Sequence, residues 1–140
     1  MSKFAVVSWS GTGNTEQMAA AVVEGINAKG GEAVVVSCGD LTPASLGDYA
    51  GFAFGCPSMG AEVLEESEFQ PMWDGVKSAL SGKKVVLFGS YGWGDGEWMR
   101  TWVAEAEDCN ITVAEHYICN ETPGDDELTE CKNLGGALVG

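Results

Sequence analysis

Residues 8–15 read Ser8-Trp9-Ser10-Gly11-Thr12-Gly13-Asn14-Thr15, and this stretch decides the fold. It follows a short apolar run over residues 4–7, which predicts a buried strand. Three apolar residues spaced four apart come next (Met18, Val22 and Ile26), and this spacing predicts the buried stripe of a helix. The polar stretch is therefore expected to connect a strand to a helix.

This loop combines two glycines with hydroxyl and amide side chains and contains no lysine or arginine. Glycine lets the backbone approach a ligand closely, and the N–H groups at a helix N-terminus form an anion site. Four side chains are candidate donors: Ser10, Thr12, Asn14 and Thr15. The composition predicts a phosphate held by neutral donors. A polar turn that only caps the helix explains the loop alone equally well.

Two commoner phosphate loops do not fit these residues. A triphosphate loop needs a lysine to meet the phosphate charge, but Glu16 and Gln17 follow Thr15 here. A dinucleotide fingerprint starting at Gly11 needs its third glycine where Glu16 stands. A loop without a cation suits one terminal phosphate better than a chain of two or three.

The composition limits the fold and the partners. With 140 residues, 45% of them hydrophobic, the chain is expected to form one domain over residues 1–140. Seven basic and 21 acidic residues leave a formal net charge of −14. A surface this acidic repels nucleic acid and anionic membranes and favours partners with basic faces. We therefore expect neither nucleic-acid nor membrane binding.

The cysteines and the N-terminus indicate the compartment. The five cysteines are odd in number and contain no C-x-x-C pair, which predicts reduced thiols and no metal site. Met1-Ser2-Lys3 leads directly into the first strand, so no signal peptide is expected. No apolar run reaches the length of a membrane span. These features predict a cytoplasmic protein.

Strand-like and helix-like segments alternate along the chain. Further strands are expected at 33–36, 52–54, 85–88 and from 111 to about 118. Residues 39–48 are expected to form a loop with at most a short helix, the later strands are separated by helices, and Asp125 or Asp126 is expected to cap a last helix. Five apolar strands alternating with helices predict a parallel sheet covered on both faces. Right-handed crossovers then favour a doubly wound α/β fold, a three-layer α/β/α arrangement with strand order 2-1-3-4-5.

In this topology ligands bind beyond the carboxyl ends of the strands, at the switch point between strands 1 and 3. The loops over residues 8–15, 56–68 and 89–96 should therefore converge. The last of these has four glycines and two aromatic residues. Trp93 between two glycines is poorly explained as core and is expected to stack on a planar group. Tyr91 fits ligand contact and ordinary packing equally well.

Three blocks of sequence resemble the flavodoxins, specifically the short-chain clostridial kind. The first is Trp9 to Glu16, as quoted above. The second is Met59-Gly60 followed by Glu62-Val63-Leu64-Glu65-Glu66-Ser67-Glu68. The third is Leu87-Phe88-Gly89-Ser90-Tyr91-Gly92-Trp93-Gly94-Asp95-Gly96 with Trp98-Met99. The resemblance extends over essentially the whole chain.

The resemblance implies noncovalently bound FMN and one-electron transfer at low potential. It implies that the first loop holds the phosphate, that Met59 and Trp93 flank the two faces of the flavin ring, and that Glu62 binds the ring N3–H. Asn120 is expected to touch the cofactor from the loop after strand 5. The expected cofactor-binding residues are Ser10, Gly11, Thr12, Gly13, Asn14, Thr15, Pro57, Ser58, Met59, Gly60, Ala61, Glu62, Ser90, Tyr91, Gly92, Trp93, Gly94 and Asn120.

Two positions depart from the family pattern. Family members often carry serine or threonine after the cysteine that ends strand 3, where this chain has Pro57, with Ser58 as a possible substitute. Ala61 stands where an acidic or polar residue is frequent. A backbone carbonyl at Gly60 is expected to turn toward the flavin N5–H in the one-electron reduced state, because glycine permits the required positive φ.

The function expected from these features is electron transfer without catalysis. The cofactor would shuttle between semiquinone and hydroquinone, made strongly reducing by a run of surrounding carboxylates (Glu62, Glu65, Glu66, Glu68, Asp95 and Glu97). A monomer is expected, with redox proteins that have basic docking faces as partners, such as ferredoxin-linked oxidoreductases and reductases.

Three alternatives belong to other classes of protein. An FMN-dependent NAD(P)H quinone or nitro reductase would turn over a small substrate, but no added segment for nicotinamide is visible. A flavin-binding sensor module would lack a route for electrons. A phosphorelay receiver would need a phospho-accepting aspartate after strand 3, where this chain has Cys56.

Overall fold

The structure is a computed structural model that describes residues 2–60 and 62–140. Five parallel strands form one sheet in the order β2-β1-β3-β4-β5, which confirms the predicted fold class. The strands are β1 (Lys3–Ser8), β2 (Glu32–Val35), β3 (Gly51–Gly55), β4 (Lys84–Tyr91) and β5 (Thr112–Asn120). The helices are α1 (Asn14–Ala28), α2 (Phe69–Val76), α3 (Glu97–Asp108) and α4 (Asp125–Val139), with short 3₁₀ helices η1 (Cys38–Asp40), η2 (Pro43–Asp48) and η3 (Lys77–Leu80).

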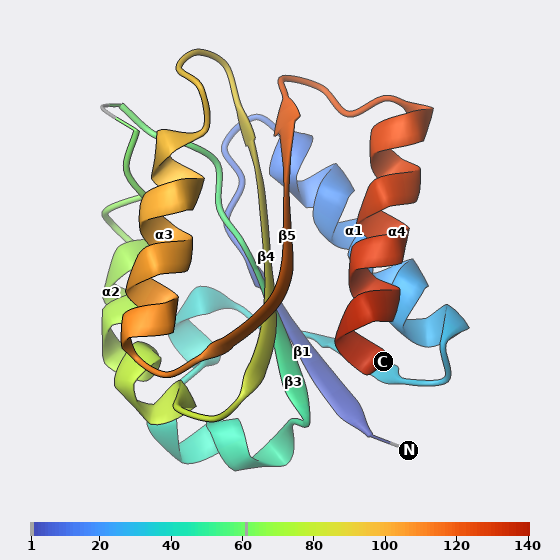
Figure 1. Ribbon diagram of the computed structural model, residues 1–140, viewed down its shortest axis with the longest axis vertical. Coiled ribbons are helices and arrows are strands. Elements are labelled where there is room, and N and C mark those ends of the chain that lie inside the picture. The colour runs from blue at the N-terminus through green and yellow to red at the C-terminus, as the bar shows by residue number, and fades with distance from the viewer. Residues whose placement is uncertain (1, 61) are drawn as a thin grey trace.

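Helices cover the sheet on both faces, with α2 and α3 on one face and α1 and α4 on the other (Figure 1). The alternation of side chains along β1 separates the two cores: Ala5 and Val7 pack toward α2 and α3, whereas Phe4 and Val6 pack toward α1 and α4. Met18, Val22 and Ile26 are fully buried, as the spacing of four predicts.

The two edge strands differ from the expected burial. Val35 of β2 is 75% exposed, and only Cys119 of β5 is buried, the other residues of that strand being partly or fully exposed. Each edge strand pairs with a neighbour on one side only, and β2 is four residues long. The apolar sequence of β2 predicted a buried strand, but as an edge strand β2 is only partly covered.

The strands leading into the cavity end later than predicted. β4 pairs with β5 as far as Tyr91 and Asn120, so Ser90 and Tyr91 belong to the strand and Asn120 is the last residue of β5. The N-cap of α4 is Gly124, whose N–H donates to the Glu127 carboxylate at 2.8 Å. The expected cap at Asp125 or Asp126 is therefore wrong by one or two residues.

Candidate functional site

The loops that follow β1, β3, β4 and β5 lie together beyond the carboxyl ends of the strands, at the top of Figure 1. They enclose a cavity of about 490 Å³, within the usual size of a small-molecule site. It is lined by Trp9, Gly11, Thr12, Asn14, Pro57, Ser58, Met59, Ser90, Tyr91, Gly92, Glu121 and Thr122. The predicted convergence of the three loops is thus observed, with the β5 loop as a fourth wall.

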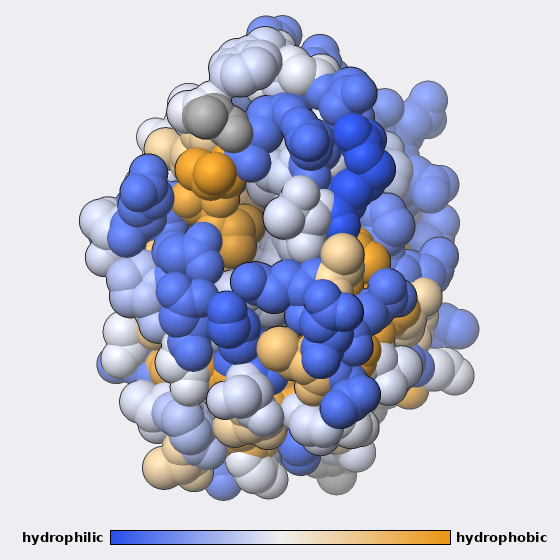
Figure 2. Space-filling model, turned by 60° about the vertical axis from the view of Figure 1, so that its left-hand side comes forward, coloured by the Kyte–Doolittle hydropathy of each residue, from blue (hydrophilic) through white to orange (hydrophobic). Residues whose placement is uncertain are grey.

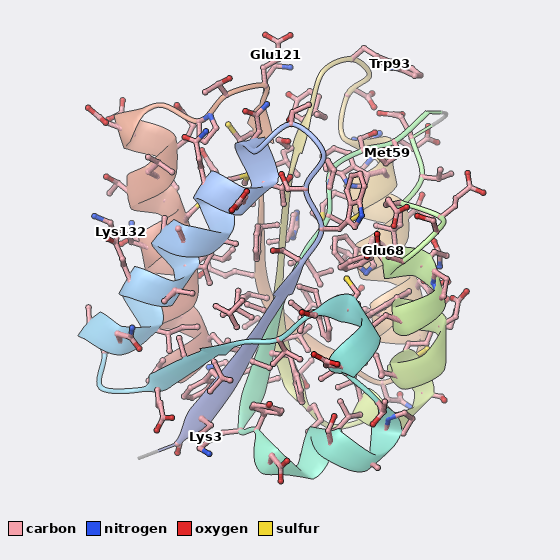
Figure 3. The ribbon with its side chains drawn as sticks, turned by 180° about the vertical axis from the view of Figure 1, so that it is seen from behind. Lys3, Met59, Glu68, Trp93, Glu121 and Lys132 are labelled. Atoms are coloured by element: carbon pink, nitrogen blue, oxygen red, sulfur yellow. The ribbon has the colours of Figure 1, made fainter. Side chains whose placement is uncertain are left out.

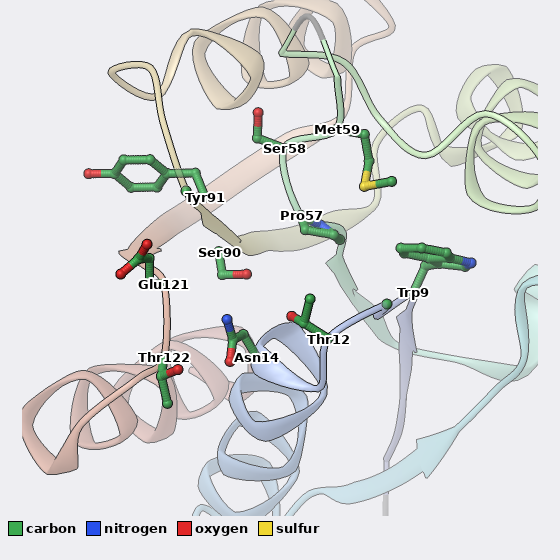
Figure 4. A pocket seen from close by; sticks show the side chains of 12 residues that line it. Trp9, Thr12, Asn14, Pro57, Ser58, Met59, Ser90, Tyr91, Glu121 and Thr122 are labelled. Atoms are coloured by element: carbon green, nitrogen blue, oxygen red, sulfur yellow. The ribbon is translucent and has the colours of Figure 1, made fainter.

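Nine of these twelve residues were expected from the sequence, and three were not: Trp9, Glu121 and Thr122. In Figure 4, Asn14 and Ser90 extend toward the middle of the cavity, Trp9 and Met59 lie on one side, and Tyr91 and Glu121 lie on the other. None of the twelve lining residues is lysine or arginine. An anion in this cavity would therefore be held by neutral donors.

The loop over residues 8–15 leads directly into the first turn of α1. Gly13 is the N-cap of α1 with φ +95°, a conformation that favours glycine, and its N–H donates to Ser10 Oγ at 3.0 Å. The N–H groups of the first turn of a helix have no partner within the helix. With Thr12 and Asn14 lining the cavity, these groups form the donor-rich end expected for a phosphate.

Thr15 is buried and does not line the cavity. Its Oγ1 lies 3.2 Å from Ser90 Oγ and accepts the Ser90 N–H at 3.4 Å. The Ser90 carbonyl accepts the Ser58 N–H at 3.0 Å. Backbone and side-chain hydrogen bonds therefore connect the first turn of α1, the end of β4 and the segment after β3.

The segment after β3 folds back on itself as a tight turn. Met59 and Val63 exchange two backbone hydrogen bonds of 2.9 and 3.0 Å, and Gly60 has φ +47°. Ala61, a predicted site residue, lies outside the described residues. Pro57 and Ser58 both line the cavity, but the Ser58 hydroxyl points away from Thr12 and Asn14 in Figure 4.

Glu62 and Gly94 join this turn to the loop after β4. Glu62 has φ +58°, which is uncommon for a residue with a side chain. Its Oε1 is buried and accepts no hydrogen bond within the described part of the chain. A Cβ built on Gly94 would lie 2.0 Å from that oxygen, so only a residue without a side chain lets the carboxylate occupy this place. A buried carboxylate oxygen without a partner fits an N–H donor on a ligand.

Trp93 lies outside the cavity, with 65% of its surface exposed, at the outer end of its loop (Figure 3). The loop is tied to α3 by Arg100, which donates to the Asp95 carbonyl at 3.0 Å and to its carboxylate at 2.9 Å. This ion pair lowers the pKa of Asp95. Asp95 thus has a cationic neighbour that the composition of the loops alone did not suggest.

Glu65 differs most from its expected environment. The sequence places it in a run of carboxylates around the cofactor without setting it apart, but unlike its neighbours Glu66 and Glu68 it is buried, with 5% of its surface exposed. Burial alone would raise its pKa, but hydrogen bonds from the Ser67 hydroxyl and from the N–H groups of Phe69, Glu68 and Ser67 outweigh that effect and lower the pKa to about 2. Glu65 is therefore an ionised carboxylate that caps the start of α2.

Asn120 lies beside the cavity without lining it. Its Nδ2 donates to the Tyr91 carbonyl at 3.3 Å, and the same carbonyl accepts the Glu121 N–H at 2.7 Å. Glu121 has φ +57°, and the bend places its side chain against the cavity. No periodicity or motif in the sequence marks Glu121 or Thr122, because their place depends on where β5 ends.

The buried thiol of Cys56, next to the cavity-lining Pro57, is unreactive. Cys56 directly follows β3 and is fully buried, and desolvation raises its pKa to about 12. A thiol in this state is neither a nucleophile nor a redox group at neutral pH.

Within residues 2–60 and 62–140, no helix has the length and apolar character needed to cross a bilayer.

A doubly wound sheet whose switch-point cavity has a cation-free, donor-rich end is typical of proteins that bind a phosphorylated cofactor. A family model described as Flavodoxin matches residues 6–135. A flavodoxin of Megasphaera elsdenii is 44% identical over 134 residues, covering 96% of each chain. A flavodoxin of Clostridium beijerinckii is 40% identical over 134 residues, covering 96% of this chain and 97% of that protein.

A solved structure agrees with these relatives. The solution structure of two-electron reduced Megasphaera elsdenii flavodoxin matches with a TM-score of 0.89 and 43% identity, covering 97% of this chain and 98% of the other. The chain therefore belongs to the flavodoxin family, and the predicted family is confirmed. Flavodoxins are electron-transfer proteins that bind FMN, and FMN is accordingly the cofactor of this chain.

Proposed function

We propose that this chain is a low-potential one-electron carrier that holds FMN noncovalently in the cavity and cycles between the semiquinone and hydroquinone forms. One observation carries the proposal: the cavity has a donor-rich end without lysine or arginine. A second observation supports it, because the buried Glu62 Oε1 accepts no hydrogen bond within the described residues. These two features match the two ends of a flavin phosphate, a terminal anion and a ring with an N–H donor.

The residues divide into groups by the part of the cofactor they would bind. Ser10, Thr12, Asn14 and Thr15, with the glycines between them, would hold the phosphate. Met59 lines the cavity and would lie against one face of the ring, with Trp93 against the other. Glu62 would accept the ring N3–H. The Gly60 carbonyl would accept the N5–H of the one-electron reduced ring.

Partners would approach the face that carries these loops. Val63 and Trp93 are exposed, at 42% and 65%, and exposed carboxylates lie on the same loops. Figure 2 shows the corresponding side of the molecule, where hydrophobic surface forms small patches among hydrophilic residues. Acidic surroundings of this kind steer basic faces toward the cofactor. We infer that the chain acts as a cytoplasmic monomer, with ferredoxin-linked oxidoreductases and reductases as its partners.

The test is reconstitution of the full chain with FMN followed by stepwise reduction. We expect stoichiometric uptake of FMN, a long-lived one-electron form in a dithionite titration, and no oxidation of NAD(P)H with quinone or nitro acceptors. Failure to bind FMN would contradict the proposal. Turnover of NAD(P)H with a small acceptor would instead support a reductase.

A further inference from the structure

Four aromatic side chains form a path from the cavity into the core between the sheet and helices α2 and α3. Tyr91 lines the cavity (Figure 4), and its ring centroid lies 5.6 Å from that of Trp98. Trp98 and Trp102 are four residues apart on α3, so they lie on the same side of the helix with about 5–6 Å between their Cβ atoms. The ring centroids of Trp102 and Trp73 are 5.8 Å apart. The path therefore connects the cavity to α2 through successive neighbouring rings.

The three indole N–H groups of this path differ in their surroundings. Trp98 Nε1 donates to the Cys56 carbonyl, a neutral acceptor, at 3.2 Å. Trp102 Nε1 is buried and has no hydrogen-bond partner within the described part of the chain. Trp73 Nε1 donates to Glu105 Oε1 at 2.5 Å. Of the three indoles, the one at the end of the path is therefore bonded to a carboxylate.

Glu105 connects this last indole to the surface. Its side chain is 39% exposed, whereas Trp73 is fully buried. Its other oxygen, Oε2, accepts Lys77 Nζ at 3.2 Å, which leaves Oε1 to the indole. A carboxylate within hydrogen-bond reach can accept a proton from its donor, and an exposed one can pass that proton to water.

These surroundings decide where a positive charge on the path would rest. An indole that loses one electron carries a positive charge, and an unpaired charge in an apolar interior is costly. The charge is therefore unfavourable on Trp98 and Trp102, but on Trp73 the nearby Glu105 carboxylate would offset it. Loss of an electron also makes an indole N–H acidic, and the proton of Trp73 has an anionic acceptor. An oxidising equivalent that enters at the cavity should therefore end on Trp73.

We propose that Tyr91, Trp98, Trp102 and Trp73 conduct an oxidising equivalent from the cavity to Glu105 at the surface. The inference rests on the proposed function, since the oxidant is bound FMN excited by light. Tyr91 gives one electron to the excited flavin, and each later residue of the path then gives one electron to the residue before it. Trp73 finally loses its Nε1 proton to Glu105. The products are a flavin reduced by one electron, a neutral Trp73 radical and a protonated Glu105, and return of the electron and the proton restores the starting state.

The test is transient absorption of the full chain loaded with FMN, after a pulse of blue light. Uptake of FMN is measured first. Protonated and deprotonated tryptophan radicals differ in their visible spectra, and we expect a deprotonated radical that outlives the first separation of charge. Under prolonged illumination in air, oxygen reoxidises the flavin and the radical persists. Mass spectrometry of peptides should then find oxidation at Trp73, although this residue is fully buried.

Three variants test the route. Trp102→Phe replaces the middle indole with a ring that is hard to oxidise, so the deprotonated radical and the oxidation of Trp73 should be lost. Glu105→Gln keeps an oxygen acceptor but removes the anion, so the radical should stay protonated and disappear faster. Asp74→Asn is the matched control, because Asp74 also pairs with Lys77, at 3.1 Å, but lies outside the path; it should leave the radical unchanged.

The outcomes distinguish this inference from the proposed function. A chain that takes up FMN without forming a deprotonated tryptophan radical would overturn the inference and leave FMN binding intact. The same radical in both Trp102→Phe and Glu105→Gln would also overturn it. If Trp102→Phe does not fold, the Glu105→Gln result decides alone. A chain that takes up no FMN would contradict the proposed function, and this inference with it.

Discussion

Replacing Glu65 by glutamine tests whether a buried carboxylate holds the loop beside the cavity in place. Its hydrogen bonds at the start of α2 lower its pKa from 4.5 to about 2. A difference of this size between the folded and unfolded chain corresponds to about 3 kcal/mol of stability at pH 7. Because the amide oxygen of glutamine can keep some of the hydrogen bonds, we expect Glu65→Gln to destabilise the protein by about 2–3 kcal/mol.

The sign of the pH dependence follows from the direction of the shift. The ionised Glu65 stabilises the folded chain, so its contribution is complete above pH 4.5 and is lost as the pH falls toward 2. By pH 3 less than roughly half of it should remain. The assay is urea unfolding of the FMN-free chain at pH 7 and pH 3, followed by tryptophan fluorescence.

Glu66→Gln is the matched control, since it removes the same charge from the exposed neighbouring residue. A surface change of this kind should alter stability by less than about 0.5 kcal/mol. Equal losses in the two variants at pH 7 would refute the capping role. A difference between them that stays as large at pH 3 would refute the pH argument.

The remaining predictions concern the cofactor. Gly60→Val should lower the population of the one-electron reduced form in a potentiometric titration, because valine resists the φ of +47°; an unchanged population would remove this role. Gly94→Ala should displace the Glu62 carboxylate and weaken FMN binding on the order of tenfold, measured by fluorescence titration. The pair Glu66→Gln and Glu97→Gln should raise the potential of the second electron by on the order of tens of millivolts.

Most of the fold could be predicted from local pattern. Apolar runs such as residues 4–7 marked the strands, the spacing of Met18, Val22 and Ile26 marked a helix, and the right-handed crossover rule fixed the strand order. The end of β4 could not be predicted, because Gly89 and Ser90 interrupt the apolar run and leave Tyr91 as a single strand-forming residue before Gly92. Pairing with β5 keeps them in the strand.

The lining of the cavity could be predicted where a local sequence motif forms it. The loop over residues 8–15 is an example, because its glycines and hydroxyl groups lie at the start of α1, and the apolar spacing in the sequence already predicts that helix. Glu65 could not be told apart from the other carboxylates of its run, because its capping role shows only once the start of α2 is located. Glu121 was missed because its place depends on a hydrogen bond to the distant Tyr91 carbonyl.

The charge distribution connects the proposed potential to the proposed partners. Negative charge added to a cofactor in this cavity would meet peptide dipoles, hydroxyl groups and the carboxylates of Glu62 and Glu121. Arg100, the cation of the neighbouring helix, is already paired with Asp95. A carboxylate about 10 Å away opposes a new charge by roughly 1–2 kcal/mol at an effective dielectric near 20, and about 1.4 kcal/mol equals 59 mV for one electron. Because the same field attracts basic protein faces, an acidic rim that makes the reduced cofactor a strong donor also brings its acceptors to it.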